Sequence, residues 1–409
     1  MTASSTAPPR RTPLIVLLGI LTALDAIAID MYLPAMPTMQ QHFATSAAWV
    51  QASLAVFLVG LAVGQLVYGP LADRYGRRTP LLAGMASFFA GSVLILLADN
   101  IETVLAGRAL QALGGAAALV IPRAIVADLF EEQQAARVYS ILMLVMGLGP
   151  VLAPSLGGVL AEQLGWQSIF VALALFGLLC LGAVYLWVEE SLPSERRNDE
   201  SLLRSMRGYL QLLGNAHYRR YTWIIALFCA SLFTYISGVP FVLIDIYGLS
   251  PAHFGFVFAA NAIGMCLLSL LNVALLRRYS PERLLLTAGI LHMGFLLPLA
   301  AAELMALSNA LSAILMLSGA ICSLGLVWGN AMSLVMKGQR EQAGRASALA
   351  GVAQYALASL AGAALGMLDG HGAASMYALM AVIAVITLVS LCRAVHHPRA
   401  ESKEVSFSS

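Results

Sequence analysis

Residues 69–78 read Gly69-Pro70-Leu71-Ala72-Asp73-Arg74-Tyr75-Gly76-Arg77-Arg78, a short polar stretch between two apolar runs. The runs lie near 48–70 and 79–98 and are each about 20 residues long, which is enough for a helix to cross a hydrocarbon core of about 30 Å. Basic residues are enriched in the cytoplasmic loops of membrane proteins. The stretch is therefore typical of a cytoplasmic loop that joins two transmembrane helices.

The composition of the whole chain agrees with a membrane protein. The chain has 409 residues, of which 60% are hydrophobic and 11% are charged, and its formal net charge is +2. A soluble globular chain carries about a quarter charged residues, so too few are present here to cover a water-exposed surface. The low charge also argues against a disordered chain, and the weak net charge argues against a nucleic-acid partner.

Twelve apolar runs are long enough to span a bilayer. They lie near 13–36, 48–70, 79–98, 102–125, 138–162, 167–188, 221–244, 254–276, 283–304, 309–335, 344–367 and 373–395. Only helices and closed barrels satisfy their own backbone in lipid, and these runs are too long for barrel strands. The sequence predicts an all-α integral membrane protein with twelve transmembrane helices.

Basic residues are confined to alternate loops. Of the 23 lysines and arginines, Arg108 and Arg123 lie well inside the fourth predicted span, and the other 21 fall in the first tail, every second loop and the last tail, or at the span ends beside them. The positive-inside rule then places both termini in the cytoplasm. We expect a tail at 1–12, a six-helix bundle at 13–188, a cytoplasmic linker at 189–220, a second six-helix bundle at 221–395 and a tail at 396–409. The linker is expected to be partly helical along the membrane surface around Leu202–Leu213.

The two predicted halves share a short repeat. An offset of 204 residues, which aligns Tyr68 with Asn272, brings matching residues together in equivalent loops. Leu71, Arg74, Tyr75, Leu81 and Leu82 then meet Leu275, Arg278, Tyr279, Leu285 and Leu286. Duplicated halves are how many secondary transporters build a substrate site at the interface between the halves.

The loop at 69–78 closely resembles the cytoplasmic loop motif of the major facilitator superfamily, GxLaDrxGrR. A positive-inside anchor would explain its arginines but neither its glycines nor its acid. The resemblance implies a charge network that latches the two halves on the cytoplasmic side. The motif residues are Gly69, Asp73, Arg74, Gly76, Arg77 and Arg78. In the second copy Arg277 and Ser280 replace Asp73 and Gly76, so we expect no equal latch there.

Three further stretches carry the resemblance. In the fourth span, Arg108-Ala-Leu-Gln111-Ala-Leu-Gly114-Gly115 resembles the membrane-arginine motif of the superfamily. In the fifth, 147–158 resembles the antiporter motif GPxxGG with two added residues. Its key positions are Gly149, Pro150, Pro154, Gly157 and Gly158. That motif is associated with exporters, although a glycine- and proline-rich helix also serves close packing in membranes.

The first span narrows the family. It contains Ile29-Asp30-Met31-Tyr32-Leu33-Pro34-Ala35-Met36-Pro37, which resembles the first-helix motif of the bicyclomycin/chloramphenicol-resistance (Bcr/CflA) subfamily of drug–proton antiporters. The similarity extends over the whole chain. It implies the major facilitator fold, export of small amphipathic drugs or metabolites in exchange for protons, a place in the bacterial inner (cytoplasmic) membrane, and action as a monomer.

Four ionisable residues lie inside predicted spans, where each costs about 2.5–3.5 kcal/mol at the centre of a lone helix. They are Asp25, Asp30, Arg108 and Arg123. At 1.5 Å per residue, Asp30 and Arg108 both lie about 9 Å below the outer surface, so an ion pair or water-bridged pair is feasible. We interpret Asp30 as the proton-coupling acid and Arg108 as its partner; the alternative is a static salt bridge.

The other two buried charges have open roles. Asp25 lies about 140° around the helix from Asp30, so it is either a second proton site or a structural hydrogen-bonding group. Arg123 lies near the cytoplasmic end of its span, where it either pairs with Asp128 or extends to the membrane surface.

Polar and aromatic residues within apolar spans are the candidates for the wall of a substrate cavity. They are Tyr32, Gln111, Tyr235, Asn261, Trp328, Asn330, Gln354 and Tyr355. Each serves equally well as a helix–helix hydrogen bond or an interfacial anchor.

Other chemistry finds little support. The five cysteines lie singly in apolar runs, the seven histidines lack metal-ligand spacing, and no glycine-rich phosphate loop is present. We expect no metal, no cofactor and no enzymatic activity. The predicted function is proton-coupled efflux by alternating access, with a small-molecule substrate, protons and the lipid bilayer as partners. The alternatives are a proton-coupled importer or facilitator of a nutrient and, from another class, a membrane enzyme or receptor.

Overall fold

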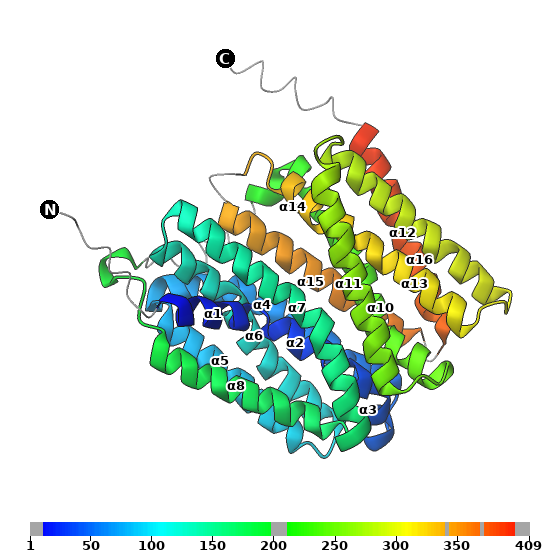
Figure 1. Ribbon diagram of the computed structural model, residues 1–409, viewed down its shortest axis with the longest axis horizontal. Helices are drawn as coiled ribbons and strands as arrows, with labels where there is room; N and C mark the ends of the chain where they lie inside the picture. The colour runs from blue at the N-terminus through cyan, green and yellow to red at the C-terminus, as the bar shows by residue number, and fades with distance from the viewer. Residues whose placement is uncertain (1–10, 198–210, 340–342, 369–371, 397–409) are drawn as a thin grey trace. The chain divides into compact units, whose positions relative to one another are not determined.

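The computed structural model describes residues 11–197, 211–339, 343–368 and 372–396, and this part of the chain is helical throughout, without β-strands (Figure 1). Twelve helical segments are long and apolar enough to cross a membrane, from Pro13–His42 to Ala373–Val395. The predicted all-α fold with twelve spans is confirmed.

The first six spans contain eight α-helices and one 3₁₀ turn. They are α1 (Arg11–Thr22), α2 (Leu24–Asp30), the 3₁₀ turn η1 (Leu33–Ala35), α3 (Met36–His42), α4 (Ala47–Tyr75), α5 (Arg78–Leu96), α6 (Ile101–Leu129), α7 (Glu132–Leu164) and α8 (Gln167–Trp187), with a further 3₁₀ turn η2 (Ser194–Arg196) after them. α1 to α3 together form the first span.

The last six spans follow the same plan. They comprise α10 (Ala216–Pro240), the π-helical turn η3 (Phe241–Ile246), α11 (Pro251–Leu275), α12 (Pro281–Leu304), α13 (Ala310–Ser323), the 3₁₀ turn η4 (Leu324–Leu326), α14 (Trp328–Val335), α15 (Ala343–Met367) and α16 (Ala373–His396). Most of the predicted linker helix, and most of both tails, fall outside the described residues; residues 211–214 are helical.

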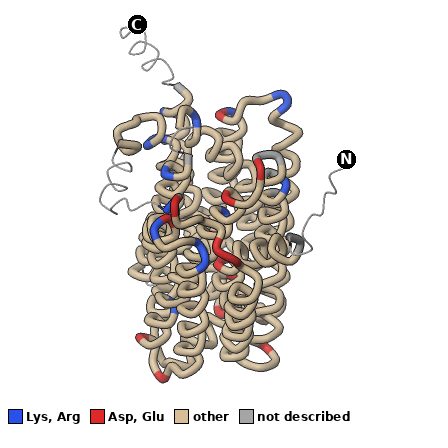
Figure 2. The backbone as a smooth tube through the Cα atoms, turned by 90° about the vertical axis from the view of Figure 1, so that its left-hand side faces the viewer, with Lys and Arg blue, Asp and Glu red and all other residues tan. Residues whose placement is uncertain are grey.

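The chain forms two compact units. One comprises residues 1–45, 56–205 and 250–258, and the other comprises residues 46–55, 206–249 and 259–409. Figure 2 shows that charged residues are few along the described helices, most of which carry neither Lys or Arg nor Asp or Glu over long stretches.

Helix ends extend beyond the apolar runs because polar residues cap them. Asn100 begins α6 by accepting a hydrogen bond from the backbone N–H of Thr103 at 2.8 Å, and Asn215 does the same for Tyr218 at 3.0 Å at the start of α10. Such caps satisfy backbone donors that have no partner within the helix. The seventh span thus begins at Ala216, five residues before the apolar run indicates.

Two spans are broken rather than continuous. The first changes from α2 to α3 through a 3₁₀ turn that contains Pro34, and Pro37 stands in the first turn of α3, where a missing N–H is tolerated. The tenth changes from α13 to α14 through η4. Short 3₁₀ segments inside a helix often mark functional hinges, and both breaks adjoin candidate site residues.

Small residues bring α5 and α6 together. A Cβ added at Gly91 would lie 2.6 Å from the carbonyl oxygen of Gly107, and one added at Gly114 would lie 2.5 Å from that of Gly84. Close approach through small residues is the usual way in which membrane helices pack. The α5–α6 pair is therefore a rigid base for the arginine that α6 carries.

We expect Gly91→Val to lower the free energy of unfolding by about 1–3 kcal/mol, because the new side chain would overlap the backbone of α6. The measurement is the thermal midpoint of the purified protein in detergent. Gly182→Val on α8 is the matched control, since a Cβ there meets nothing within 4 Å. Equal midpoints for the two variants would contradict the packing described here.

Candidate functional site

The two acids of the first span lie on α2. Asp25 is in its first turn and Asp30 is its last residue, and their exposed fractions are 4% and 5%. The two acids are five residues apart on this helix. The breaks on either side of α2 thus enclose a short helix with an acid at each end.

Arg108 on α6 is the largest of the fully buried side chains, with an exposed fraction of 0%. Its guanidinium carbon lies 4.3 Å from the ring centroid of Tyr32 and 4.3 Å from that of Phe57. Its Nη1 donates hydrogen bonds of 3.0 Å to the carbonyl oxygen of Ala28 and to Oε1 of Gln111. A cation over an aromatic face is attracted by the ring quadrupole, most strongly when water is excluded.

Of the two arrangements expected for Asp30 and Arg108, the direct ion pair is not formed in the described part of the chain, where the guanidinium contacts Tyr32, Phe57, Ala28 and Gln111. A water-bridged pair stays a prediction. Equal depth along the helix axis does not fix the rotation of a side chain about that axis. Ala28 and Tyr32 are four residues apart and share a face, whereas Asp30 lies about 200° from Ala28. The face that meets Arg108 is therefore not the face that carries Asp30.

Gln111 orients the arginine. While its Oε1 accepts from Arg108, its Nε2 donates to Oγ of Ser92 at 2.8 Å, and Ser92 in turn donates to the carbonyl of Phe88 at 2.8 Å. This chain of hydrogen bonds links α6 to α5 and fixes the amide. Gln111 is buried with an exposed fraction of 0%, so its role here is to hold Arg108.

The other cavity candidates fall into separate pairs. Asn261 donates to the hydroxyl of Tyr235 at 2.8 Å, and Nδ2 of Asn330 donates to Oδ1 of Asn272 and to the carbonyl of Leu326, both at 2.8 Å. These groups are buried and serve as hydrogen bonds between or within helices.

The remaining candidates are half-buried. Trp328 is the first residue of α14. The ring of Tyr355 lies edge-on to the ring of Phe233, with 6.3 Å between the ring centroids. Gln354 donates to the carbonyl of Ala350 in its own helix at 3.1 Å. Contact of these three side chains with a substrate stays a prediction.

The antiporter motif packs against the acidic helix. Pro150 and Pro154 lie inside α7, and a Cβ added at Gly149 would be 3.4 Å from that of Ala26. A Cβ added at Gly157 would strike the carbonyl of Met31. Gly158 beside it is also buried. The glycines at 149 and 157 thus let α7 approach α2 at Ala26, between the two acids, and at Met31, directly after Asp30.

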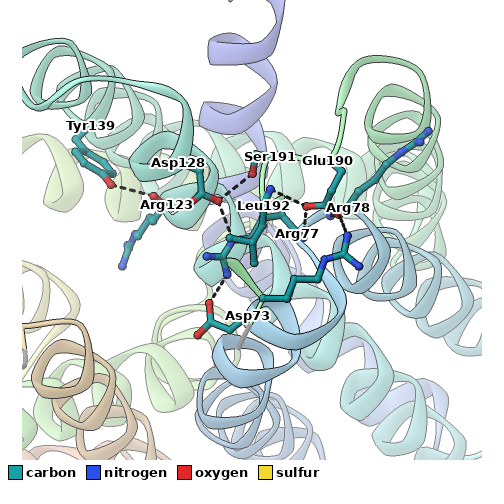
Figure 3. A network of polar contacts seen from close by, with 10 residues as sticks. Asp73, Arg77, Arg78, Arg123, Asp128, Tyr139, Glu190, Ser191 and Leu192 are labelled. Carbon is teal, nitrogen blue, oxygen red and sulfur yellow. Dashed lines mark hydrogen bonds and ion pairs between the residues drawn. The ribbon is translucent and has the colours of Figure 1, made fainter. Parts of the chain in front are cut away.

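The loop at 69–78 builds a charge network around Arg77 (Figure 3). The Nη1 of Arg77 lies 2.6 Å from Oδ1 of Asp73 and its Nε lies 2.9 Å from Oδ2 of Asp128, which also accepts from the hydroxyl of Ser191 at 2.9 Å. Burial lowers the pKa of Arg77, but the hydrogen bonds and charges of Asp128 and Asp73 outweigh burial and raise the pKa above its ordinary value.

Glu190 completes this network. Its carboxylate accepts the backbone N–H groups of Arg77 at 2.7 Å, Arg78 at 3.3 Å and Leu192 at 3.0 Å. It thereby caps the start of α5, where a negative charge is favoured. Gly76 has a φ of +87°, and a Cβ there would collide with the Glu190 carboxylate. The second glycine of the motif is therefore required both by its backbone conformation and by this contact.

The remaining residues of the motif make fewer contacts that would explain why they are required. Nη2 of Arg78 donates to the carbonyl of Tyr185 at 2.7 Å, and the guanidinium of Arg74 lies over the ring of Tyr75 at 5.4 Å. A Cβ at Gly69 meets nothing within 4 Å. The partners described for Arg77 and Glu190 all lie between α4 and the segment after α8, so a latch between the two halves stays a prediction.

Of the two roles expected for Arg123, the ion pair with Asp128 is not formed among the described residues, and Oδ2 of Asp128 accepts from Arg77 and Ser191. The carbonyl of Arg123 accepts from the hydroxyl of Tyr139 at 2.9 Å instead (Figure 3).

Several functional residues were missed by sequence reasoning. Phe57 and Ser92 look like ordinary residues of apolar spans, and no sequence signal distinguishes them. Asp128 and Glu190 carry a signal, since each is an acid at the end of a span next to the basic loop. Charge complementarity among neighbouring loops could have identified both.

Twelve membrane-length helices with acids and an arginine sealed inside define a multi-pass membrane transporter. The sequence pattern of the Major Facilitator Superfamily matches residues 18–363. The chain belongs to this superfamily. Because its members are transporters, the expectation that the chain is not an enzyme is confirmed.

Several relatives are similar in sequence to this chain over nearly the full length of both proteins. The uncharacterized MFS-type transporter YdgK of Bacillus subtilis (strain 168) is 34% identical, with 92% of this chain and 94% of the relative covered. The bicyclomycin resistance protein homolog of Haemophilus influenzae is 28% identical, covering 92% and 94%. The multidrug resistance protein MdtL of Escherichia coli O9:H4 is 30% identical, covering 91% and 92%. These likenesses confirm the predicted Bcr/CflA type.

A solved structure agrees on the fold. The D-xylose-proton symporter has a TM-score of 0.75 at 15% identity, with 93% of this chain and 97% of that chain covered. At this identity the likeness shows the major facilitator fold alone.

We expect Phe57→Leu to lower the free energy of unfolding by about 1–2 kcal/mol, because Arg108 loses one of its two aromatic faces in a fully buried site. Phe57→Tyr keeps a ring and should retain the wild-type thermal midpoint within about 1 kcal/mol. If the two variants were equally stable, the aromatic rings would not be what stabilises the buried cation.

We expect Glu190→Ala to destabilise the protein by about 1–3 kcal/mol, because three backbone donors lose their acceptor. Thermal unfolding in detergent measures this, with the exposed Glu195→Ala as the control. A midpoint for Glu190→Ala that matches the control would show that water replaces the carboxylate without loss.

Proposed function

We propose that this transporter is a proton-coupled efflux antiporter of the bacterial inner membrane that exports small amphipathic drugs or metabolites by alternating access. The names of the relatives in bicyclomycin and multidrug resistance support export. The single observation that carries proton coupling is the burial of Asp30 and Asp25 on one short helix without an ion pair between Asp30 and Arg108.

A buried carboxylate without a paired cation is costly. In the described part of the chain, no basic group lies within ion-pairing distance of Asp30. Asp30 therefore favours either a bound proton or the positive group of a substrate. The two ligands exclude each other at one carboxyl group, and this mutual exclusion is the basis of exchange.

Asp25 strengthens this competition. Two interacting carboxylates in a site of low polarity are unfavourable when both are charged, so a proton on one of them favours the charged form of the other. The charge of Arg108 on α6 packs against another face of α2 and offsets part of the negative charge without an ion pair to Asp30. We propose Asp30 as the coupling acid and Asp25 as the second acid of the site.

In the proposed transport step, the two halves of the chain expose the site alternately to the inside and to the outside. With the site open to the inside, a substrate binds at Asp30 as the proton leaves; with the site open to the outside, a proton binds and the substrate leaves. The two halves rock about the site between these states. Net movement of substrate outward then draws on the inward proton gradient. Of the proposed cavity residues, Trp328 and Tyr355 offer aromatic surface to an amphipathic molecule.

The test is proton-driven uptake of a fluorescent cationic dye into inside-out vesicles, where export appears as uptake. We expect Asp30→Asn to reduce dye movement driven by the proton gradient by at least tenfold, because the amide cannot exchange a proton. Asp99→Asn, an exposed acid at the end of α5, is the matched control. Protein amounts are compared in the same membranes.

Two results would overturn the proposal. Full proton coupling in Asp30→Asn would remove Asp30 from the mechanism. Dye movement in the opposite direction, or a nutrient that moves inward with protons, would establish the importer instead.

A further inference from the structure

A buried histidine lies halfway along α12, away from the acids of the first span. His292 is the twelfth of the 24 residues of α12 and has an exposed fraction of 1%. Ionisable residues at this depth of a membrane helix are rare and are functional candidates by default. The transport step described above makes no use of this residue.

Both ring nitrogens of His292 have partners on other helices. Nδ1 lies 3.0 Å from the carbonyl oxygen of Ala320 on α13, and Nε2 lies 2.8 Å from Oγ of Ser231 on α10. A carbonyl oxygen can only accept, so Nδ1 carries the hydrogen and the neutral Nε2 accepts from the Ser231 hydroxyl. The ring of Phe228 on α10 packs edge-on at 5.8 Å. The imidazole is thus fixed among three helices.

The carbonyl that His292 binds is the one that the break in the tenth span leaves free. In a continuous α-helix the N–H of Leu324 would bond to Ala320, four residues earlier. Here the N–H of Leu324 bonds to Ile321 and Cys322 instead. The freed oxygen of Ala320 accepts from His292 and from the Ser323 hydroxyl at 2.6 Å. A buried carbonyl without a partner is costly, so these bonds stabilise the break.

The break sets the direction of α14. Its first residue, Trp328, follows the 3₁₀ turn by two positions. On the far side of the turn, Asn330 bonds to the carbonyl of Leu326 and to Asn272 on α11. The turn is therefore held at Ala320 by His292 and at Leu326 by Asn330. Interrupted helices are where secondary transporters commonly form substrate sites.

We propose that His292 is a positioning residue for transport: through its Nδ1–H it holds the break between α13 and α14 and thereby directs Trp328 toward the substrate. The proposal rests on the proposed transport function for the role of Trp328 in binding. The placement of Trp328 by His292 stands on the geometry alone, so the two can be tested separately.

The first measurement needs no transport. Acrylamide quenching of tryptophan fluorescence is recorded for the purified full-length protein, and the signal of the matched Trp328→Phe protein is subtracted to isolate Trp328. We expect His292→Leu and His292→Gln to change the quenching constant of Trp328 at least twofold. His292→Asn should keep the quenching constant of Trp328 close to the wild-type value, because the amide N–H of asparagine lies where the Nδ1–H of histidine was. Ser231→Ala, which leaves the bond to Ala320 intact, is the control.

The second measurement is dye transport in inside-out vesicles. His292→Leu should raise the half-saturating dye concentration about tenfold with little change in maximal rate, and His292→Asn should stay within about threefold of wild type. Should His292→Leu not fold, His292→Gln keeps a polar side chain and still lacks a donor at the Nδ1 position. Unchanged quenching in both variants overturns the proposal.

The two measurements separate the two proposals. Altered quenching with no transport of any dye by the wild type would leave the positioning role intact and refute the export function. Altered quenching with an unchanged half-saturating concentration would overturn the link between Trp328 and the substrate.

Discussion

A positive charge buried inside a membrane bundle is costly unless its surroundings stabilise it. Around Arg108, Nη1 is hydrogen-bonded. Nε and Nη2 have no hydrogen-bond partner in the described part of the chain and lie beside the aromatic rings instead. Two aromatic rings, a backbone carbonyl and one amide surround the guanidinium, and they come from three different spans. The contacts of Arg108 with Ala28 and Tyr32 fix the rotation of α2, and of the turn after it, against α6. The acid at the end of α2 is thereby directed to another face. The arginine positions Asp30 without neutralising it.

Buried side chains also stabilise the breaks in the first and tenth spans. Tyr32 lies in the turn that follows α2, and the glycines of α7 allow close contact with Ala26 and Met31 just before that turn. In the second half of the chain, the break after Ser323 places Trp328 at the start of a new helix. Each half thus carries one interrupted span, and each interruption is held by buried side chains. A transporter needs such points, because a continuous helix offers no free backbone groups and little room to bend.

Much of the fold followed from the sequence, because hydropathy and charge act over whole spans. Twelve spans, the basic loop around Asp73 and Arg77, and the buried charges were all predictable. The pairing of Asp30 with Arg108 was not, because residue counting gives depth but not rotation about the helix. The bond from His292 to Ala320 and the cradle of backbone donors at Glu190 join residues far apart in the chain, and no local pattern indicates such contacts.

The central claim is that a proton and a substrate compete for Asp30. It is tested most directly by measuring protons released into weakly buffered detergent solution when a cationic dye binds the purified protein. The account predicts proton release from the wild-type protein on dye binding and none from Asp30→Asn. Equal proton release by both proteins, or dye binding to the wild type without any release, would contradict it.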